Sequence, residues 1–536
     1  MSGGAPGRGG GGRERRRRRH WQLNGTPLLR VYTRRRAREL AIQDAAAAQR
    51  RQLQWLLAQG RRTRFGRDHG FAALSTIGEY QRAVPLRRWE DLWREYWQPE
   101  FPRLVDCTWP GRVPFFAQTS GTTTGATKYI PCTRQMIASN RRATMDLVTH
   151  HLVNRPASKL FGGRNFMLGG STALIPLAPG VWSGDLSGIA GRTVPLWARP
   201  FYFPPRDLET IADWEEKIAA FAPASLEVDI RALGGTPSWL LLFLERLAAL
   251  DPKAGRRLVH FYPNLELLVH GGMSFEPYRA AFSEWLAGSR AETREVYPAS
   301  EGFIAVADRG DGEGLRLVCD NGLFFEFVPV SELEDPCPTR HWVGNLEPGV
   351  NYAIVLSTCA GLWSYVIGDT VRFVERNPPR LLVTGRTSYS LSAFGEHLIG
   401  EELEHGVASA AAAIGANVAD WSAGALYPSR SDERGGHLFI VEFVESIPPA
   451  PLLDRFARVL DQTLAGLNED YQAHRSNDFG MRPPTIHPVT PGTFAGWMKR
   501  RGKLGGQNKV PRIITDRSLL DDLKAFAGFT RPGNSA

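Results

Sequence analysis

A loop rich in glycine and hydroxyl side chains, set between two apolar segments, is the feature that most restricts the fold. Residues 115–131 read FFAQTSGTTTGATKYIP, with Gly121 and Gly125 four positions apart and Lys128 three positions later. The common nucleotide-binding loop GxxxxGK[ST] leads from a strand into a helix, whereas the YIP after Lys128 is strand-like and ends in proline. The pattern therefore predicts a loop between two strands, whose N–H groups, hydroxyls and ammonium are suited to phosphate oxygens. An ordinary solvated turn is the alternative.

Length and composition indicate an ordinary globular protein with more than one domain. A chain of 536 residues is too long for one hydrophobic core, and 43% hydrophobic with 22% charged residues is typical of soluble proteins. Five scattered cysteines without a CxxC pair indicate neither a zinc site nor a disulfide framework. The most apolar window, residues 239–250, is well short of the ~20 residues that a membrane span needs. We therefore expect a cytoplasmic monomer that does not enter the membrane.

Residues 1–36 read as an arginine- and glycine-rich tail. Its first 20 residues hold seven arginines against one glutamate, which is +6 of the chain's net charge of +10. Glycines and like charges leave little to bury, so the pattern predicts disorder. An arginine-rich arm would suit phosphate contacts in a nucleic-acid-binding protein. We favour a solvated extension, because the rest of the chain carries only the remaining +4.

Helical and strand-like patterns follow the tail. Apolar residues at helical spacing predict one surface helix over residues 38–59, and a second over 274–288 with Ser274 as its N-cap. Three β-rich segments come next: they are residues 323–330, 351–358 and 369–375.

The pattern changes after residue 385. A helix, a strand over 437–444 and a helix over 451–468 follow one another there, as in a small α+β unit. We therefore predict an N-terminal domain over 37–385 and a C-terminal domain over 386–536.

Two short stretches carry further chemistry. VYPASEG (296–302) offers Tyr297 as a flat ring for adenine and Glu301 as a carboxylate for Mg²⁺. SYVIGDTVRF (364–373) offers Asp369, and a carboxylate is the usual partner of ribose hydroxyls. Each signal is weak alone, because a strand tyrosine is more often core and Gly-Asp is a common turn.

Taken in order, these stretches resemble a known family. TSGTTTGATK, YPASE, YVIGD, GRTSYSLSAFGEHLIGEELE and GQNKVPR follow the succession of motifs in acyl-adenylate-forming enzymes. Within that superfamily the chain resembles the Gretchen Hagen (auxin-responsive) family of acyl acid amido synthetases, from about residue 40 to the C-terminus. The resemblance implies a mixed α/β and α+β fold, with a large N-terminal domain that has mixed sheets and a β-barrel subdomain, and a smaller mobile C-terminal α+β domain.

The resemblance also implies residue roles. Glu301 would hold Mg²⁺ and, with Ser300, meet the α-phosphate, while Lys509 would reach the α-phosphate from the C-terminal domain. Lys509, Lys128 and Glu301 would thus be the catalytic residues. The triphosphate would be held by the loop residues Ser120, Gly121, Thr122, Thr123, Gly125 and Lys128.

The adenosine moiety would be held by the strand ends. Gly271 and Gly272 would lie along the adenine, Tyr297 would flank the base and Asp369 would bind the ribose. Arg386 would begin the hinge between the domains.

Departures from the family pattern concern two positions above all. Ala299 replaces the first serine of YxSSE, and Val366 replaces the arginine of YRxGD, so any contact made by those side chains is lost. Thr119 and Thr123 replace serines of the loop but keep the hydroxyls.

The implied activity is an ATP- and Mg²⁺-dependent ligation of a carboxylic acid to an amino acid through an acyl adenylate. An acyl-CoA or acyl-carrier-protein ligase is the alternative within enzymes, since it shares the adenylation step. We expect the acid pocket within residues 130–240, although its apolar stretches would equally suit core packing. His270 beside Gly271 is the one histidine placed as a general base, and a structural role for it is favoured.

Overall fold

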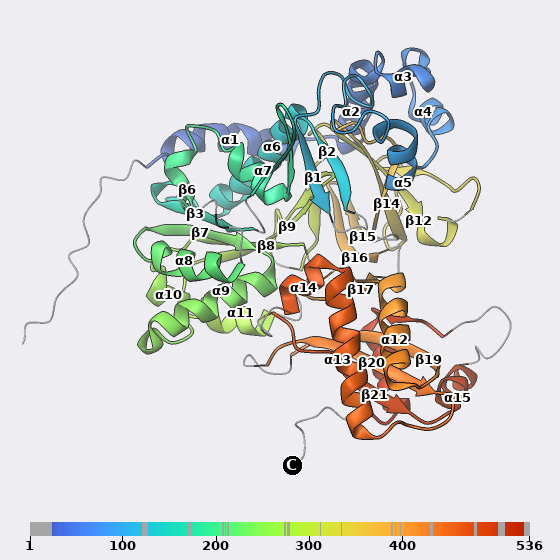
Figure 1. Cartoon of the computed structure of the whole chain (residues 1–536). Helices are drawn as coiled ribbons and strands as arrows, with labels where there is room; N and C mark the ends of the chain where they lie inside the picture. The colour runs from blue at the N-terminus through green and yellow to red at the C-terminus, as the bar shows by residue number, and fades with distance from the viewer. Residues whose placement is uncertain are drawn as a thin grey trace, which may run out of the picture.

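The computed structural model describes most of the chain. The described residues are 24–119, 127–169, 173–205, 208, 211, 214–272, 275, 279–310, 312–333, 335–386, 390–391, 393–396, 398–428, 433–475, 480–501 and 510–529. Figure 1 shows a larger assembly of sheets and helices from the N-terminal part and a smaller unit, orange to red, from the C-terminal part.

The helices before the first strand correct two expectations. A break at residues 42–44 divides the helix expected over 38–59, because the Asp44 carboxylate caps a new helix by accepting a hydrogen bond from Ala47 N at 2.9 Å. The first helix already begins at Thr26, so residues 26–36 are helical and the expected tail is too long by that segment. Residues 1–23 lie outside the described part. The helices of this region are α1 Thr26–Ala41, α2 Ala45–Gly60, α3 Arg64–Asp68, α4 Ile77–Ala83, α5 Trp89–Leu92 and α6 Arg134–Asn154.

A small sheet carries the ends of the glycine-rich loop. Its strands, in the order β2-β1-β5-β4, are β1 Phe115–Thr119, β2 Lys128–Cys132, β4 Ile175–Ala178 and β5 Val181–Gly184. Strands β1 and β2 are antiparallel, with Thr119 opposite Lys128. The expected loop between two strands is thereby confirmed, while residues 120–126 of the loop itself lie outside the described residues.

Among the described residues, twelve strands form one large sheet in the order β13-β12-β14-β15-β16-β11-β10-β9-β8-β7-β3-β6. The parallel half comprises β3 Arg164–Leu168, β6 Tyr202–Phe203, β7 Ile230–Gly235, β8 Leu267–Gly271 and β9 Glu292–Ala299. The other half is antiparallel and comprises β10 Gly302–Val306, β11 Leu315–Leu317, β12 Leu323–Pro329, β13 His341–Trp342, β14 Asn351–Thr358, β15 Tyr365–Arg376 and β16 Pro379–Arg386. The β-rich segments expected at 323–330, 351–358 and 369–375 are therefore strands.

The mixed sheets expected of the large N-terminal domain are present, and the antiparallel half is the part that corresponds to the expected β-barrel subdomain. Its inward side chains share one apolar core, to which Tyr297, Phe325 and Phe373 belong, so the strands curl around a common interior. The strand order nevertheless stays open, because β9 continues directly into the parallel half through β8.

Helices pack beside the parallel half, as connections between parallel strands require (Figure 1). They are α8 Trp214–Ser225, α9 Pro237–Leu250, α10 Leu258–Phe261 and α11 Arg279–Leu286. Helix α7 Leu186–Arg192 packs instead with the small sheet, since Ile189 belongs to the cluster that contains Phe116 of β1. The helix expected over 274–288 thus begins at Arg279, and its proposed cap Ser274 lies outside the described residues.

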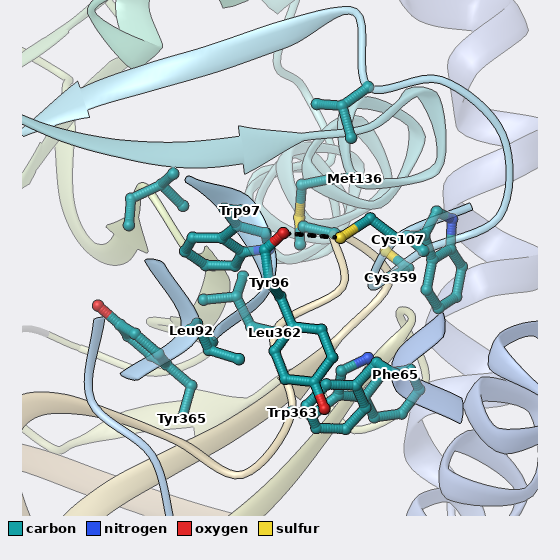
Figure 2. Close-up of a cluster of buried hydrophobic side chains, with 14 of the residues drawn as sticks. Phe65, Leu92, Tyr96, Trp97, Cys107, Met136, Cys359, Leu362, Trp363 and Tyr365 are labelled. Carbon is teal, nitrogen blue, oxygen red and sulfur yellow. Dashed lines mark hydrogen bonds between the residues drawn. The ribbon is translucent and has the colours of Figure 1, made fainter. Parts of the chain in front are cut away.

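An aromatic cluster fixes the small sheet against the large one. Phe65, Trp97, Met136 and Trp363 are all fully buried in it (Figure 2). Phe116 of β1 belongs to the same cluster, so the hairpin that ends at Lys128 stands on a rigid base.

The C-terminal part forms the expected α+β unit. Its sheet has the order β21-β20-β19-β22, and α12 and α13 pack on the sheet through an apolar core. No helix in the described part of the chain is long and apolar enough to cross a membrane. The elements are β17 Ser390–Leu391, β18 Leu398–Ile399, α12 Gly400–Ile414, β19 Val418–Leu426, β20 Gly436–Phe443, α13 Ala450–Leu467, α14 Glu469–Arg475, β21 Thr485–Val489, α15 Thr493–Arg500, β22 Ile513–Ile514 and α16 Arg517–Phe526.

Candidate functional site

Two of the predicted site residues meet directly. The hydroxyl of Tyr297 on β9 donates a hydrogen bond of 2.5 Å to Asp369 Oδ2 on β15. Strands β16, β11 and β10 separate β9 from β15 in the sheet, so the contact depends on the curl of the antiparallel half. Both side chains are buried, which holds the Asp369 carboxylate in a fixed orientation.

A second contact joins the same two segments. The Tyr365 hydroxyl, four residues before Asp369 on β15, lies 3.4 Å from Glu301 Oε1, in the turn that follows β9. Figure 2 shows Tyr365 at the periphery of the aromatic cluster, with its hydroxyl pointing away from the other labelled side chains. Tyr297, Glu301, Tyr365 and Asp369 together form what we call the tyrosine–carboxylate cluster.

Tyr365 is a member of this cluster that sequence reasoning missed. Tyr365 opens the motif YVIGD that Asp369 closes four positions later on β15. Its place in the motif could therefore have indicated it, whereas strand alternation could not, because the pairing of β15 with β14 shifts register between Val366 and Thr370. Ser300, predicted to meet the α-phosphate, lies half-buried in the same turn as Glu301.

The two glycines at the end of β8 leave room that a side chain would close. A Cβ on Gly271 would stand 2.1 Å from the Val296 carbonyl oxygen of the adjacent strand β9, so this position requires glycine. Gly272 has φ +83°, in the left-handed region. The side chain of His270 is fully buried, and its ring stacks on Phe275 with 3.8 Å between centroids. The structural role that we favoured for His270 agrees with this packing.

Lys128 has two close partners on α5. Its Nζ lies 2.9 Å from Glu90 Oε1 and 5.4 Å from the centroid of the Trp89 ring. The lysine is mostly buried, whereas Glu90 is 41% exposed, so a phosphate ligand would compete with a carboxylate that solvent already screens. No pattern in the sequence pointed to Glu90.

The replaced motif positions pack in apolar surroundings. Val366 lies in a small apolar cluster with Val328 and Val355. Ala299 packs against the apolar core of the antiparallel half. The absence of the family's arginine and serine therefore leaves the tyrosine–carboxylate cluster complete.

The remaining predicted residues lie at or beyond the limits of the described chain. Arg386 ends β16 and stands opposite Asp369 in the strand register. The segment after Lys509 is anchored to β19, since Ser422 donates to the Pro511 carbonyl at 2.7 Å. Outside the described residues lie Ser120, Gly121, Thr122, Thr123, Gly125 and Lys509.

A divalent ion would find one protein carboxylate here. Among the described residues, no group of three or more His, Cys, Asp or Glu side chains is placed to hold a metal. Mg²⁺ in nucleotide enzymes commonly takes one or two carboxylates and completes its shell with phosphate oxygens and water. Glu301, buried in its turn beside Tyr365, fits that mode.

The cysteines are not arranged for covalent catalysis. All five are free thiols and four are buried. Burial raises the pKa of the Cys107, Cys132 and Cys359 thiols to about 12, so little thiolate is present at neutral pH.

Three family models match the chain. They are the GH3 family N-terminal domain over residues 34–172, the central domain over 316–386 and the C-terminal domain over 401–518. Together these segments cover more than half of the sequence.

Curated relatives are plant enzymes. The chain is 27% identical over 269 residues to the probable indole-3-acetic acid-amido synthetase GH3.9 of Oryza sativa subsp. japonica, across 44% of this chain and 57% of the relative. It is also 27% identical over 291 residues to indole-3-acetic acid-amido synthetase GH3.8 of Oryza sativa subsp. indica, across 49% and 46%. The chain thus spans about half the length of the curated relatives that it matches.

Solved structures agree in fold. The AtGH3.15 acyl acid amido synthetase in complex with 2,4-DB matches with a TM-score of 0.58 at 18% identity, over 93% of this chain and 95% of that chain. A 2-hydroxyisobutyryl-CoA ligase with 2-HIB-AMP and CoA matches with a TM-score of 0.54 at 16% identity, over 90% and 93%. With the three family models in chain order and this fold, the chain belongs to the GH3 family.

Proposed function

We propose that the chain is an ATP-dependent acyl acid amido synthetase, which adenylates a carboxylic acid and transfers the acyl group to an amino acid. The observation that carries the proposal is the tyrosine–carboxylate cluster, in which the hydrogen bond from Tyr297 orients Asp369 beside the turn of Glu301. Family membership and the amido synthetases among the relatives support the same activity.

In the first step the acid's carboxylate oxygen forms a bond to the α-phosphorus of ATP, and the bond from that phosphorus to the bridging oxygen of pyrophosphate breaks. Asp369 accepts hydrogen bonds from the ribose, and Tyr297 keeps its carboxylate in place. Negative charge grows on the phosphoryl oxygens during this step, so Lys128 and Lys509 stabilise the transition state. The glycines at 271 and 272 let the adenine lie against the end of β8.

Magnesium would be held by Glu301 together with phosphate oxygens, where it would supply positive charge for the departing pyrophosphate. The turn after β9 places that carboxylate next to the Tyr365 hydroxyl, at 3.4 Å.

In the second step the amino acid nitrogen forms a bond to the acyl carbon and the bond to AMP breaks, with loss of one proton from the nitrogen. This step needs no covalent enzyme intermediate, in keeping with the buried, high-pKa thiols.

We further propose a boundary between residues 385 and 386, a mobile C-terminal domain, and a monomeric cytoplasmic protein. The end of β16 at Arg386 and the separate sheet of β19–β22 support the boundary.

The decisive experiment measures pyrophosphate release over a panel of carboxylic acids, then product formation with amino acids, coenzyme A or carrier protein as acceptor. We expect pyrophosphate with at least one acid, and AMP release with amino acids. Thioester formation instead would identify an acyl-CoA or carrier ligase. Protein that binds ATP but releases no pyrophosphate with any acid would refute the proposal.

Asp369→Asn tests the assignment of the ribose. Ribose contacts are made alike in the ground and transition states, so the KM for ATP should rise while kcat changes little. An unchanged KM with a collapsed kcat would remove Asp369 from the ribose.

A further inference from the structure

One hydrogen bond joins the two parts of the chain at a defined point. Trp239 Nε1 on α9 donates to His474 Nε2 on α14 at 2.8 Å, and the two rings are 27° from parallel. Figure 1 shows α14 at the side of the C-terminal unit that faces the large sheet. The two residues are 235 positions apart in sequence, so the contact reports how the two parts are placed.

The partners of His474 determine which of its ring nitrogens carries the proton. His474 Nδ1 lies 2.6 Å from the Asp470 carbonyl oxygen, and a carbonyl only accepts, so Nδ1 carries the proton. Nε2 then holds the lone pair that accepts from the indole N–H, which can only donate. His474 is 4% exposed, so a side chain without an acceptor would lose this bond without replacement by bulk water.

On the side of the N-terminal part, the contact lies near the end of β8 at Gly271 and Gly272, which we call the proposed nucleotide edge. Helix α9 starts at Pro237 directly after β7, and β7 pairs with β8 so that Gly235 stands opposite His270. A Cβ on Gly272 would lie 3.2 Å from Thr236 Cγ2. Trp239 is therefore about one helical turn from Thr236, the residue that adjoins Gly272.

On the side of the C-terminal part, the neighbours of His474 on α14 are held by close contacts with the rest of that part. Arg475, next to His474, forms two hydrogen bonds of 2.7 and 2.6 Å to Asp461 on α13. Tyr471, one turn earlier on α14, stacks on the ring of His437 at 6.0 Å.

His437 continues this chain of contacts to the segment that joins the two parts. Its Nε2 lies 2.7 Å from Glu396 Oε1, and Glu396 accepts hydrogen bonds from Ala393 N at 2.9 Å and Phe394 N at 2.6 Å. Both His437 and Glu396 are fully buried. The turn at 393–396 follows Arg386 closely. A displacement of α14 would therefore shift the segment where the C-terminal part begins.

We propose that Trp239 and His474 are positioning residues that fix the C-terminal part against the nucleotide edge for one of the two steps. The inference rests on the proposed function, because it assigns the contact to a step of that reaction. The ATP contacts proposed for Asp369 and Glu301 lie wholly in the N-terminal part, so the bond acts on kcat and not on ATP binding.

The test combines Trp239→Phe, which removes the donor, with His474→Leu, which removes the acceptor, and with the double variant. Pyrophosphate exchange and amide formation from a supplied acyl adenylate are measured separately. One of the two rates should fall roughly two- to tenfold, the range for losing one neutral hydrogen bond, while the KM for ATP stays constant. The double variant should be no slower than the single ones, because both remove the same bond.

His474→Gln should restore the rate in part, since an amide oxygen reaches about as far as Nε2. Trp497→Phe is the matched control: it removes an indole hydrogen bond of 2.7 Å to Asp522 that lies within the C-terminal part, and it should leave the ratio of the two rates unchanged. Equal loss of both rates in Trp239→Phe, or the same change of ratio in Trp497→Phe, would overturn the proposal.

A spectroscopic measurement separates this proposal from the function it rests on. Cys337 is the exposed thiol, and Arg455→Cys adds a second exposed thiol on α13. Spin labels on these two thiols report the distance between the two parts by electron paramagnetic resonance. Trp239→Phe should broaden that distance distribution even if no acid is ever adenylated. An unaltered distribution would refute the positioning role, whereas a broadened one in a protein without pyrophosphate release would refute only the proposed reaction.

Discussion

The hydroxyl of Tyr297 and the carboxylate of Asp369 meet at 2.5 Å although 72 residues and three intervening strands separate them. The bond closes the curled half of the sheet across its interior. It therefore links the fold's stability to the orientation of the proposed ribose ligand.

Tyr297→Phe should lower both the stability of the fold and the affinity for ATP. The loss of a hydrogen bond to a buried carboxylate should lower the free energy of unfolding by about 1.5–3 kcal/mol, and the freed Asp369 should raise the KM for ATP. Urea denaturation and steady-state kinetics check the two effects. Tyr365→Phe is the control, since its contact with Glu301 is long at 3.4 Å and its loss should cost less; the reverse order would contradict this assignment.

The sequence singled out three members of this candidate cluster but not the contacts between them. Tyr297, Glu301 and Asp369 stand in recognisable motifs, yet the pairing of Tyr297 with Asp369 depends on the curl of non-adjacent strands, which no local pattern encodes. Glu90 beside Lys128 was missed for the same reason, because the two residues meet through the packing of α5 on β2.

The N-terminal helix was missed for a different reason. Its many arginines read as a disordered tail, but Arg36 is drawn in by two carboxylates from distant segments, Asp146 on α6 and Asp320 after β11. Local charge density predicts disorder only where no partner is folded nearby. By contrast, the Asp44 cap that starts the second helix was visible in the sequence and could have been used.

Arg36→Met should destabilise the fold strongly. The guanidinium donates to Asp146 at 2.7 and 2.9 Å and to Asp320 at 2.8 Å twice, and the Asp146 side chain is 3% exposed. Removing one partner leaves a buried carboxylate without its counter-charge, which costs about 3–5 kcal/mol. Arg35→Met, on the 84% exposed neighbour paired with Glu39, should cost about 0.5 kcal/mol or less. Similar denaturation midpoints for the two variants would show that the Arg36 network contributes little.

Lys509→Ala should cut the adenylation rate by roughly 10²-fold, the loss expected for one preorganised transition-state donor. ATP affinity should change little, and amide formation from a supplied acyl adenylate should persist, because that step expels AMP. Pyrophosphate exchange and single-turnover amide formation measure the two halves. If Lys503→Ala abolished adenylation while Lys509→Ala preserved it, the catalytic role would belong to Lys503.

The ion-pair network around Glu292 should make stability depend on pH. Burial alone would raise the pKa of Glu292. Its hydrogen bond from His151 and the charge of Arg294 outweigh burial and lower this pKa to about 2, from an ordinary 4.5. For His151 the two effects have the opposite signs: burial lowers its pKa, but its hydrogen bonds to Glu266 and Glu292 outweigh burial and raise the pKa above 6.5.

The signs of the two shifts define a window. A carboxylate with a lowered pKa contributes stability above its unfolded pKa of about 4.5, and the contribution is lost as the pH falls toward 2. A histidine with a raised pKa contributes fully below about 6.5, and the contribution is lost as the pH rises through its folded pKa. The network should therefore stabilise the protein most between about pH 4.5 and 6.5.

Glu292→Gln tests this window. Its deficit in unfolding free energy relative to the native chain should be largest near pH 5–6 and should shrink as the pH falls below 4.5, because Glu292 of the unfolded native chain then binds a proton while folded Glu292, with a pKa of about 2, stays charged. Urea titrations at a series of pH values measure the deficit. Glu245→Gln, at a half-exposed pair with Arg256, is the control and should show a small deficit at every pH. A Glu292→Gln deficit that stayed constant down to pH 3 would mean that the charge of Glu292 contributes nothing, and that its packing and neutral hydrogen bonds account for the whole effect.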